Sequence, residues 1–165
     1  MAYKKKSWIE KLNDNKKFPK ILKFDPKFPC GKTLEKWGAK PGESVVLAPP
    51  LDVDEIMKNV PKGKLITIYK ICSQLAKKHK VKFCCSLTTG IFINISAHAA
   101  EELKEKGEKN ITPYWRTLKI DGALNRKFPG GAEAQRKMLE KEGFTIKQRG
   151  KKYFVENFEN YLVKG

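Results

Sequence analysis

Residues 112–117, Thr-Pro-Tyr-Trp-Arg-Thr, place two neighbouring aromatic side chains between a proline and an arginine. Aromatic side chains offer flat faces on which unpaired nucleobases stack, and arginine binds phosphate through several N–H donors. We therefore interpret the segment as a base-binding pocket, in which Pro113 shapes a wall, Tyr114 and Trp115 provide stacking faces, and Arg116 binds phosphate. The alternative is structural, with Trp115 in the core and Tyr114 packed beneath a hairpin.

Cysteines are the other residues able to do chemistry, and the chain has four of them: Cys30, Cys72, Cys84 and Cys85. Adjacent cysteines do not bridge each other easily, and no Cys-x-x-Cys pair is present, so the pattern predicts no zinc site. The two histidines also lack a ligand spacing, and we expect no metal ion or organic cofactor. Lysines near Cys84 and Cys85 could lower a thiol pKa. Apolar neighbours favour burial of that pair, and Cys30 is expected to be the most exposed thiol.

The charge of the chain indicates an anionic partner. Its 165 residues include 35 Lys and Arg against 18 Asp and Glu, a formal net charge of +17. Nucleic acid is the commonest partner of such a basic chain, with an acidic membrane surface second. No run approaches the roughly 18 apolar residues of a membrane span, and the first residues lack the apolar segment of a signal peptide. We therefore expect a cytoplasmic, nucleoid-associated monomer that binds nucleic acid.

Helices and strands must position these side chains, and the apolar spacing predicts where they lie. The first elements expected are a strand over 44–48 and helices over about 52–60, 67–79 and 86–106. Asp52 and Glu55 are expected to form a capping box, and Thr67 to cap the second helix. Ser86 or Thr88 would cap the third. Two helices joined by a short link in a basic chain are typical of a helix-turn-helix.

Two hairpins and a further helix are expected in the rest of the domain. Asp121-Gly122 is typical of a type I′ turn between two strands. The glycine pair at 130–131 opens a helix over 132–142, and the glycine after it ends that helix. A second hairpin over 144–155 turns at Arg149-Gly150. Helices followed by a small basic hairpin indicate a winged helix-turn-helix, which is an α+β fold.

Residues 1–43 are expected to form a basic N-terminal extension that packs partly on a single domain over 44–165. Residues 1–40 carry twelve lysines against four acids, and prolines interrupt any long helix there. Apolar residues are too frequent for a free tail. We expect a short helix near Ser7–Leu12, then an extended segment lying on the domain. We find no internal repeat.

Three stretches within residues 50–145 follow one another in a set order. They read Gly-Lys-Leu-Ile-Thr-Ile-Tyr at 63–69, Pro-Tyr-Trp-Arg at 113–116 and Gly-Gly-Ala-Glu-Ala-Gln-Arg-Lys-Met-Leu-Glu-Lys-Glu-Gly at 130–143. Together they resemble the DNA-binding domain of the O6-alkylguanine-DNA alkyltransferases (methylated-DNA–protein-cysteine methyltransferases). The resemblance implies a winged helix-turn-helix domain of the alkyltransferase type, with double-stranded DNA as its partner.

The residues at the reactive position differ from the family pattern. Alkyltransferases use the cysteine of a Pro-Cys-His-Arg motif as a thiolate, activated by the histidine and by a glutamate behind it. Tyr114 replaces the cysteine and Trp115 the histidine, while Glu142 remains. A phenol with a reference pKa of about 10 and no adjacent base is a poor alkyl acceptor. The chain is thus more similar to the alkyltransferase-like proteins, which bind alkylated guanine without repair and flag it for excision repair. Pro113, Tyr114, Trp115 and Glu142 would line the base pocket.

Other side chains are expected to hold the duplex. The base-flipping tyrosine of the family falls at Ile68, with Tyr69 one residue on. The intercalating arginine falls near Leu87 or Thr88, and a leucine could wedge into a base step. Hydroxyls and amides at the start of the recognition helix would bond phosphates. The expected DNA contacts are Tyr69, Ser86, Leu87, Thr88, Thr89, Gly90, Arg116, Arg126 and Lys127, with the lysines of the extension.

Other functions compete with lesion recognition. One is a general DNA- or RNA-binding winged helix, which would bind alkylated and unmodified duplexes equally. Another is a methyltransferase or redox protein that uses Cys84 or Cys85 and would gain mass from an alkylated oligonucleotide. A protein-interaction scaffold would require the charge to be incidental.

Overall fold

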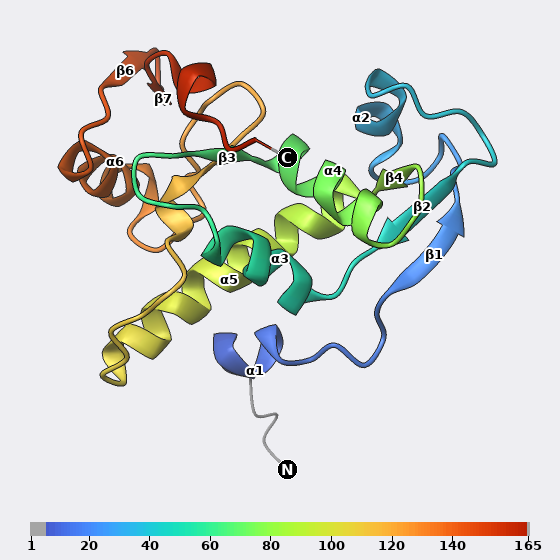
Figure 1. The fold of residues 1–165 in the computed structure, drawn as a ribbon, viewed down its shortest axis with the longest axis horizontal. Coiled ribbons are helices and arrows are strands. Elements are labelled where there is room, and N and C mark those ends of the chain that lie inside the picture. The colour runs from blue at the N-terminus through green and yellow to red at the C-terminus, as the bar shows by residue number, and fades with distance from the viewer. Residues whose placement is uncertain (1–5, 165) are drawn as a thin grey trace.

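The computed structural model describes residues 6–164, which form six α-helices, two 3-10 helices and three small sheets (Figure 1). The helices are α1 (Trp8–Leu12), α2 (Gly31–Lys36), α3 (Pro50–Lys58), α4 (Ile68–Lys78), α5 (Ser86–Glu105) and α6 (Gly131–Lys141), with 3-10 helices η1 (Tyr114–Arg116) and η2 (Phe158–Tyr161). The strands are β1 (Lys20–Lys23), β2 (Ser44–Leu47), β3 (Ile66–Thr67), β4 (Phe83–Cys84), β5 (Thr117–Leu118), β6 (Ile146–Arg149) and β7 (Lys152–Val155). This mixed content confirms the predicted α+β class.

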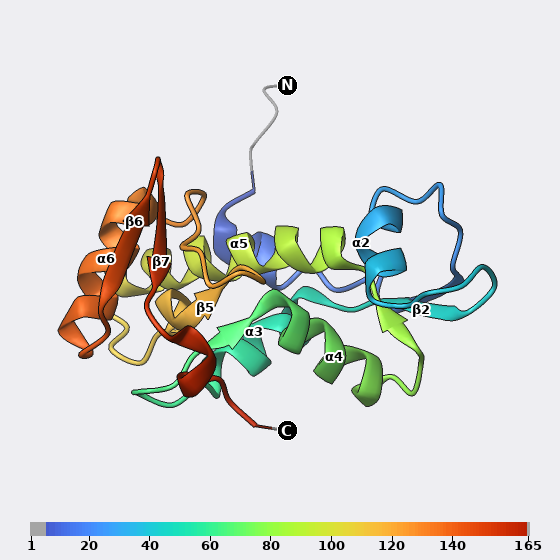
Figure 2. The same ribbon diagram turned by 90° about the horizontal axis from the view of Figure 1, so that it is seen from above.

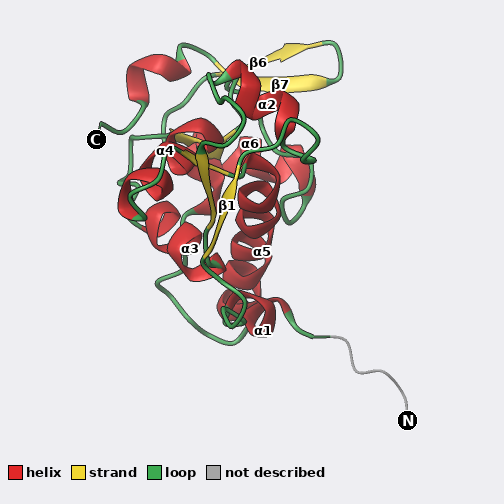
Figure 3. Cartoon of the chain, turned by 90° about the vertical axis from the view of Figure 1, so that its right-hand side faces the viewer, coloured by secondary structure: helices red, strands yellow, loops and turns green. Residues whose placement is uncertain are grey.

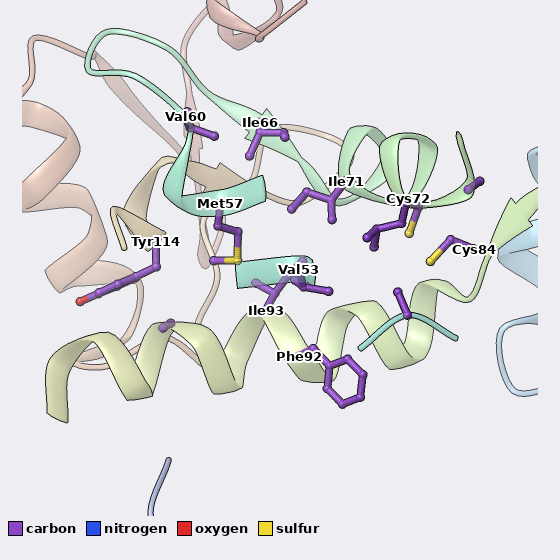
Figure 4. Packing of buried hydrophobic residues seen from close by; sticks show 14 of the residues in the cluster. Val53, Met57, Val60, Ile66, Ile71, Cys72, Cys84, Phe92, Ile93 and Tyr114 are labelled. Carbon is purple, nitrogen blue, oxygen red and sulfur yellow. The ribbon is translucent and has the colours of Figure 1, made fainter. Parts of the chain in front are cut away.

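Helix α5 is the central element, and α1, α3 and α4 pack against it. Figure 2 shows α5 running through the molecule, with α6 and the β6–β7 hairpin at one end and α2 at the other. Val53 and Met57 of α3 lie over Phe92 and Ile93 of α5, and Ile71 of α4 joins them (Figure 4). Burying each such side chain contributes about 1.5–3 kcal/mol, so this contact holds the helices together.

The N-terminal extension joins the domain through a three-stranded sheet. β1 pairs antiparallel with β2, and β2 pairs in parallel with β4, which leads directly into α5 (Figure 3). All four residues of β1 are exposed, as suits an edge strand that lysines protect from further pairing. The sheet therefore ties the extension to the first turn of α5, while the domain boundary at 43–44 stays a prediction.

The N-terminal caps of two helices were predicted with different success. The hydroxyl of Thr67 accepts the Lys70 N–H at 3.3 Å, which confirms the predicted cap of α4. Helix α5 follows Cys85 and has no side-chain cap, so the caps predicted at Ser86 and Thr88 are wrong. The Thr88 hydroxyl donates instead to the Cys85 thiol at 3.3 Å.

Helix α3 begins earlier than predicted, with Pro50 in its first turn, where a missing N–H costs nothing. The predicted capping box is wrong because Asp52 binds the end of α4 instead. Its carboxylate lies 2.8 Å from His79 Nε2 and 2.9 Å from the Lys78 ammonium. Asp52 therefore links two helices, and His79 has a polar partner.

The hairpin predicted at Asp121-Gly122 does not form. β5 pairs in parallel with the distant β3, which lets Leu118 enter a buried cluster at 1% exposure. A turn follows, and Ala123 bridges Phe154 of β7. The second hairpin, β6–β7, is antiparallel as predicted.

All four cysteines are buried and free. The prediction that Cys30 is exposed is wrong, because Cys30 is 3% exposed and packs in a cluster with Phe24 and Leu34. Among residues 6–164 no group of His, Cys, Asp or Glu side chains could hold a metal ion. No helix in that range is long and apolar enough to cross a membrane.

Candidate nucleic-acid interface

The 112–117 segment lies in the core instead of forming an open pocket. Tyr114 is 2% exposed, its hydroxyl donates to Glu101 at 2.6 Å, and its ring meets Trp115 and Phe128 edge-on. Burial and the Glu101 carboxylate hold the pKa of Tyr114 well above its usual value, so the phenol keeps its proton. Pro113 is also buried, at the start of η1. The predicted stacking face of Tyr114 is therefore not available.

Trp115 and Arg116 both bind Glu142, at the end of α6. The indole N–H donates to Glu142 at 2.7 Å, and the Arg116 guanidinium donates to it from Nε and Nη2, each at 2.9 Å. Arg116 also donates to the Val60 carbonyl at 2.7 Å. The Arg116 and Glu142 side chains are only 13% and 10% exposed. The predicted phosphate contact of Arg116 is thus corrected to an internal ion pair.

Thr112 makes the third connection of this segment. Its hydroxyl donates to the buried Asp54 of α3 at 2.8 Å, and Ser96 of α5 donates to the same oxygen at 2.5 Å. Three carboxylates from three parts of the chain therefore converge on one short segment. We call residues 112–117 together with Asp54, Glu101 and Glu142 the carboxylate hub.

An open groove lies beside the first turns of α5. It has a volume of about 230 Å³, and α5 contributes Ser86, Leu87, Gly90, Ile91, Ile93 and Asn94 to its lining. Ile68, residues 117–119, Asn125 and Lys127 complete it. We call this cavity the α5 groove. It has two lysines and no acid in its lining, so its potential is positive.

Four predicted contacts meet at the α5 groove: Ser86, Leu87, Gly90 and Lys127. Leu87 is 48% exposed, an unusual state for a leucine on the central helix. Gly90 faces only Ile68, whose methyl would lie 3.6 Å from an added Cβ, so packing alone does not require glycine there.

The remaining predicted contacts lie elsewhere. Thr89 is 1% exposed and lies 3.2 Å from the Cys84 thiol, and the Thr88 hydroxyl is bound to Cys85. Tyr69 is turned away from the groove and packs edge-on against Trp37, with ring centroids 5.0 Å apart. Arg126 is exposed beside the groove and does not line it.

The sequence did not single out Asn94, Asn125 or Thr117. The Asn125 amide donates to Asn94 at 3.0 Å and its backbone N–H donates to Gln135 at 2.7 Å, which fixes one wall of the groove. Thr117 is 2% exposed, and its hydroxyl has no hydrogen-bond partner within residues 6–164. Buried hydroxyls nearly always have a partner, so Thr117 is an unsatisfied polar group enclosed beneath this wall, not a group open to the groove. Asn125 directly precedes Arg126 and Lys127, and only these two basic residues were predicted as DNA contacts.

The N-terminal extension supports the same wall. The Trp8 indole of α1 stacks on His98, with ring centroids 4.4 Å apart and planes 20° apart. His98 Nε2 lies 2.9 Å from the Lys127 carbonyl, which can only accept, so Nε2 donates. The backbone N–H of Trp8 donates to the Glu102 carboxylate at 2.6 Å and fixes α1 on α5.

The thiols are separated from the groove by burial. Hydrogen bonding with Cys72 lowers the pKa of Cys84, and Figure 4 shows their sulfurs facing each other, but Cys84 is 2% exposed. Cys85 is 7% exposed. Burial and the Cys85 thiol raise the pKa of Cys30 to about 12. None of the four cysteines lines the α5 groove, whereas Cys30 and Cys85 line a separate cavity of about 200 Å³.

The arrangement of α3 to α6 around the hub is that of an alkyltransferase-like fold. No family model matches the sequence, and no curated protein matches it. The fold matches two solved structures from S. pombe: Atl1 in complex with damaged DNA containing O6-carboxymethylguanine, with a TM-score of 0.51, and ATL in complex with DNA, with a TM-score of 0.52. In both cases 20% of residues are identical, and the match covers 70% of this chain and 94% of the other.

Proposed function

We propose that this protein binds DNA that contains alkylated or distorted guanine and does not transfer the alkyl group. The α5 groove carries this proposal, because it combines a positive lining, two amide side chains and the exposed Leu87 in a cavity of about 230 Å³. The fold supports it, since both similar structures were solved with DNA and one of those DNAs contains O6-carboxymethylguanine.

Each wall of the groove suits one part of an extruded base. Ile68 and Leu118 offer apolar contact to the ring, and Asn94 and Asn125 offer amide groups to its polar edge. Extrusion costs a few kcal/mol, which such contacts must offset. The exposed Leu87 lies at the groove and would fill the space that the base leaves, as apolar wedges do in other DNA-binding proteins.

Phosphate binding is assigned to lysines and an arginine around the groove. Lys119, Arg126 and Lys127 are exposed, and their side chains form no ion pair within the described range. These three residues take the phosphate-binding role that was predicted for Arg116, whose donors are bound to Glu142 and Val60. Each phosphate contact of this kind releases counterions, so binding weakens steeply with salt.

The chemistry of the groove lining supports the proposed absence of alkyl transfer. Its lining contains no cysteine, and Tyr114 is a buried, protonated phenol that does not line it. A nucleophile must be deprotonated and within reach of the reacting carbon. A lesion held but not repaired would need an excision-repair protein to remove it, which we propose as a further partner.

The test is binding to one duplex with and without a single O6-methylguanine, at two salt concentrations, followed by intact mass. Tighter binding to the lesion with unchanged mass supports the proposal. Asn125→Ala is expected to reduce the lesion preference, and Asn160→Ala, an exposed asparagine near the C-terminus, serves as control. A gain of one methyl group in mass would show alkyl transfer and overturn it.

The second candidate is a general DNA- or RNA-binding protein without lesion preference. One observation favours it: Ile68 lines the groove where the resemblance expects a tyrosine, and Tyr69 packs on Trp37 instead. Without a tyrosine hydroxyl in the groove, base extrusion loses one source of support. Equal affinity for the two duplexes would establish this candidate.

A further inference from the structure

Two loop–helix units have nearly the same sequence, contrary to the expectation of no internal repeat. Residues 25–31 read Asp-Pro-Lys-Phe-Pro-Cys-Gly, and residues 125–131 read Asn-Arg-Lys-Phe-Pro-Gly-Gly. The first leads into α2 and the second into α6. These helices end in Leu-Glu-Lys-Trp-Gly at 34–38 and Leu-Glu-Lys-Glu-Gly at 139–143. We call residues 25–31 the first loop and residues 125–131 the second loop.

The two loops begin with the same side-chain turn. The Asp25 carboxylate accepts the Lys27 N–H at 2.9 Å, and the Asn125 amide oxygen accepts the Lys127 N–H at 2.9 Å. An acceptor side chain that binds the backbone two residues on fixes a tight turn. Each lysine therefore leaves the backbone at the corresponding point of its loop.

The loops also close in the same way. The Gly31 N–H donates to the Phe28 carbonyl at 2.8 Å, and the Gly131 N–H donates to the Phe128 carbonyl at 2.8 Å. A Cβ on Gly31 would collide with the carbonyl of Pro26, so only glycine fits there. The closing hydrogen bond is thus shared, whereas the backbone conformation differs at the last two residues, because Gly130 and Gly131 have φ angles of 77° and 74° and Cys30 has a φ of −89°.

The helices that follow end alike and differ in length. Gly38 and Gly143 have φ angles of 98° and 96°, and both follow the last turn as left-handed residues. Helix α2 has 6 residues and α6 has 11. The first unit is therefore a shortened structural counterpart of the second.

The two loops lie on opposite sides of Leu87. Asn125 and Lys127 of the second loop line the α5 groove, while Phe28 and Pro29 of the first loop line a separate cavity of about 200 Å³. Leu87 belongs to both linings. Figure 2 shows α2 and α6 at opposite ends of the molecule with α5 between them.

The surface of the first loop is basic. Lys23, Lys27 and Lys32 are exposed, and no ion pair involves them within residues 6–164. The nearest acid in the loop is Asp25, where the second loop has an uncharged asparagine. The first loop thus presents lysines near the start of α5, as the second loop does.

We propose that the first loop binds the DNA backbone on the side of Leu87 opposite the second loop, so that the duplex is held on both flanks of this leucine. The inference rests on the proposed binding of DNA and does not require lesion preference. Lys27 and Lys127 make equivalent phosphate contacts, one from each loop.

The first experiment measures the salt dependence of binding to an unmodified duplex for Lys27→Gln, Lys127→Gln and a control. Lys58→Gln is the control, because Lys58 is an exposed lysine at the end of α3, outside both loops. Losing one phosphate contact is expected to reduce the slope of log K against log salt by about 1. Lys27→Gln and Lys127→Gln should each show that reduction, and Lys58→Gln should not.

Asp25→Asn is expected to change the affinity for DNA in the opposite direction from the lysine variants. It gives the first loop the residue of the second and keeps the side-chain turn, as Asn125 does. Removing a negative charge beside a phosphate is expected to tighten binding by about threefold, within the range of exposed charge pairs. Unchanged affinity of Asp25→Asn, together with an unchanged slope for Lys27→Gln, would overturn the inference.

A lesion-containing duplex shortened on one side or the other locates the contacts. Shortening the duplex on one side should abolish only the effect of Lys27→Gln. Shortening it on the other side should abolish only the effect of Lys127→Gln. If both variants lose their effect with the same truncation, the two-sided arrangement is wrong. If Lys127→Gln acts and Lys27→Gln does not, the first loop is not a contact, while the proposed function stands. If both lysine variants weaken binding but the protein binds lesion-containing and unmodified duplexes equally, the two-loop contact stands and lesion recognition is wrong.

Discussion

The carboxylate hub and the α5 groove use similar side chains in opposite ways. At the hub, Thr112, Tyr114 and Arg116 all have hydrogen-bonded partners and low exposure. At the groove, Leu87 is 48% exposed, and the exposed Lys119 and Lys127 form no ion pair in the described part of the chain. The hub therefore holds the fold, and the groove is where side chains are left to meet a ligand.

This difference shows that the types of residue in a segment do not by themselves determine its role. The aromatic-arginine run had the composition of a binding site, yet Glu101 and Glu142 bind it from inside the protein. A side chain whose donors are already bonded gains little from a ligand, because a new bond must replace an old one. Four variants test the comparison.

Arg116→Ala is expected to have the largest effect, a loss of about 3–5 kcal/mol in the free energy of unfolding. It leaves Glu142 buried without its charged partner, at 10% side-chain exposure. Urea denaturation measures the loss, and Arg126→Ala, an exposed arginine, is the control. If Arg116→Ala instead left stability intact and weakened DNA binding, the hub would have to be reassigned to the interface.

Leu87→Ala is expected to weaken binding to a lesion-containing duplex by about tenfold, or about 1.4 kcal/mol. The exposed leucine contributes little to the fold, so the unfolding free energy should change by less than about 0.5 kcal/mol. Leu51→Ala is matched to it, since Leu51 is 43% exposed on α3. Equal losses for both leucines would remove the wedge assignment.

Tyr114→Phe is expected to remove a pH dependence of stability. The raised pKa of Tyr114 means that the folded state keeps a proton that the unfolded chain releases above about pH 10. The contribution is fully present below that pH and declines above it by up to about 1.4 kcal/mol per pH unit. Unfolding free energies of both proteins between pH 8 and 11 give the difference. Parallel curves would contradict the buried, protonated phenol.

Thr117→Val is expected to have the smallest main effect of the four variants, a gain of about 1 kcal/mol in the free energy of unfolding, because a buried hydroxyl without a partner is replaced by a methyl group. The same change should leave DNA binding unchanged, because this hydroxyl is buried and not exposed to the groove. Thr145→Val, at an exposed threonine, is the control. Destabilisation by Thr117→Val would mean that the hydroxyl has a structural partner.

Local patterns predicted most of the helices and little of the hub. The apolar spacing of α4, α5 and α6, and the cap at Thr67, depend on residues a few positions apart. The pairs Thr112–Asp54 and Arg116–Val60 are separated by 58 and 56 residues, and no local pattern predicts which carboxylate a threonine meets. The parallel pairing of β3 with β5 was missed for the same reason.

The candidate site was predicted in part. Ser86, Leu87 and Gly90 were predicted because they stand at the start of the expected recognition helix, and Lys127 because it belongs to a basic pair; all four line the groove. Thr117 could not be found, since a missing partner is visible only in three dimensions. The repeated Lys-Phe-Pro-x-Gly sequence was visible in the chain and was overlooked, because its copies stand 100 residues apart in unlike surroundings.

The hub also sets the order in which the molecule opens. Its bonds join α3, α5 and the end of α6, so the 112–117 segment cannot leave its site until contacts across most of the chain have broken. Segments with such connections exchange their amide hydrogens only through global unfolding, whereas elements with few buried contacts open locally. The exposed strand β1 belongs to the second kind. Strand β1 can therefore open and close locally many times within the lifetime of one folded molecule, while the buried residues Phe24 and Leu34 stay packed.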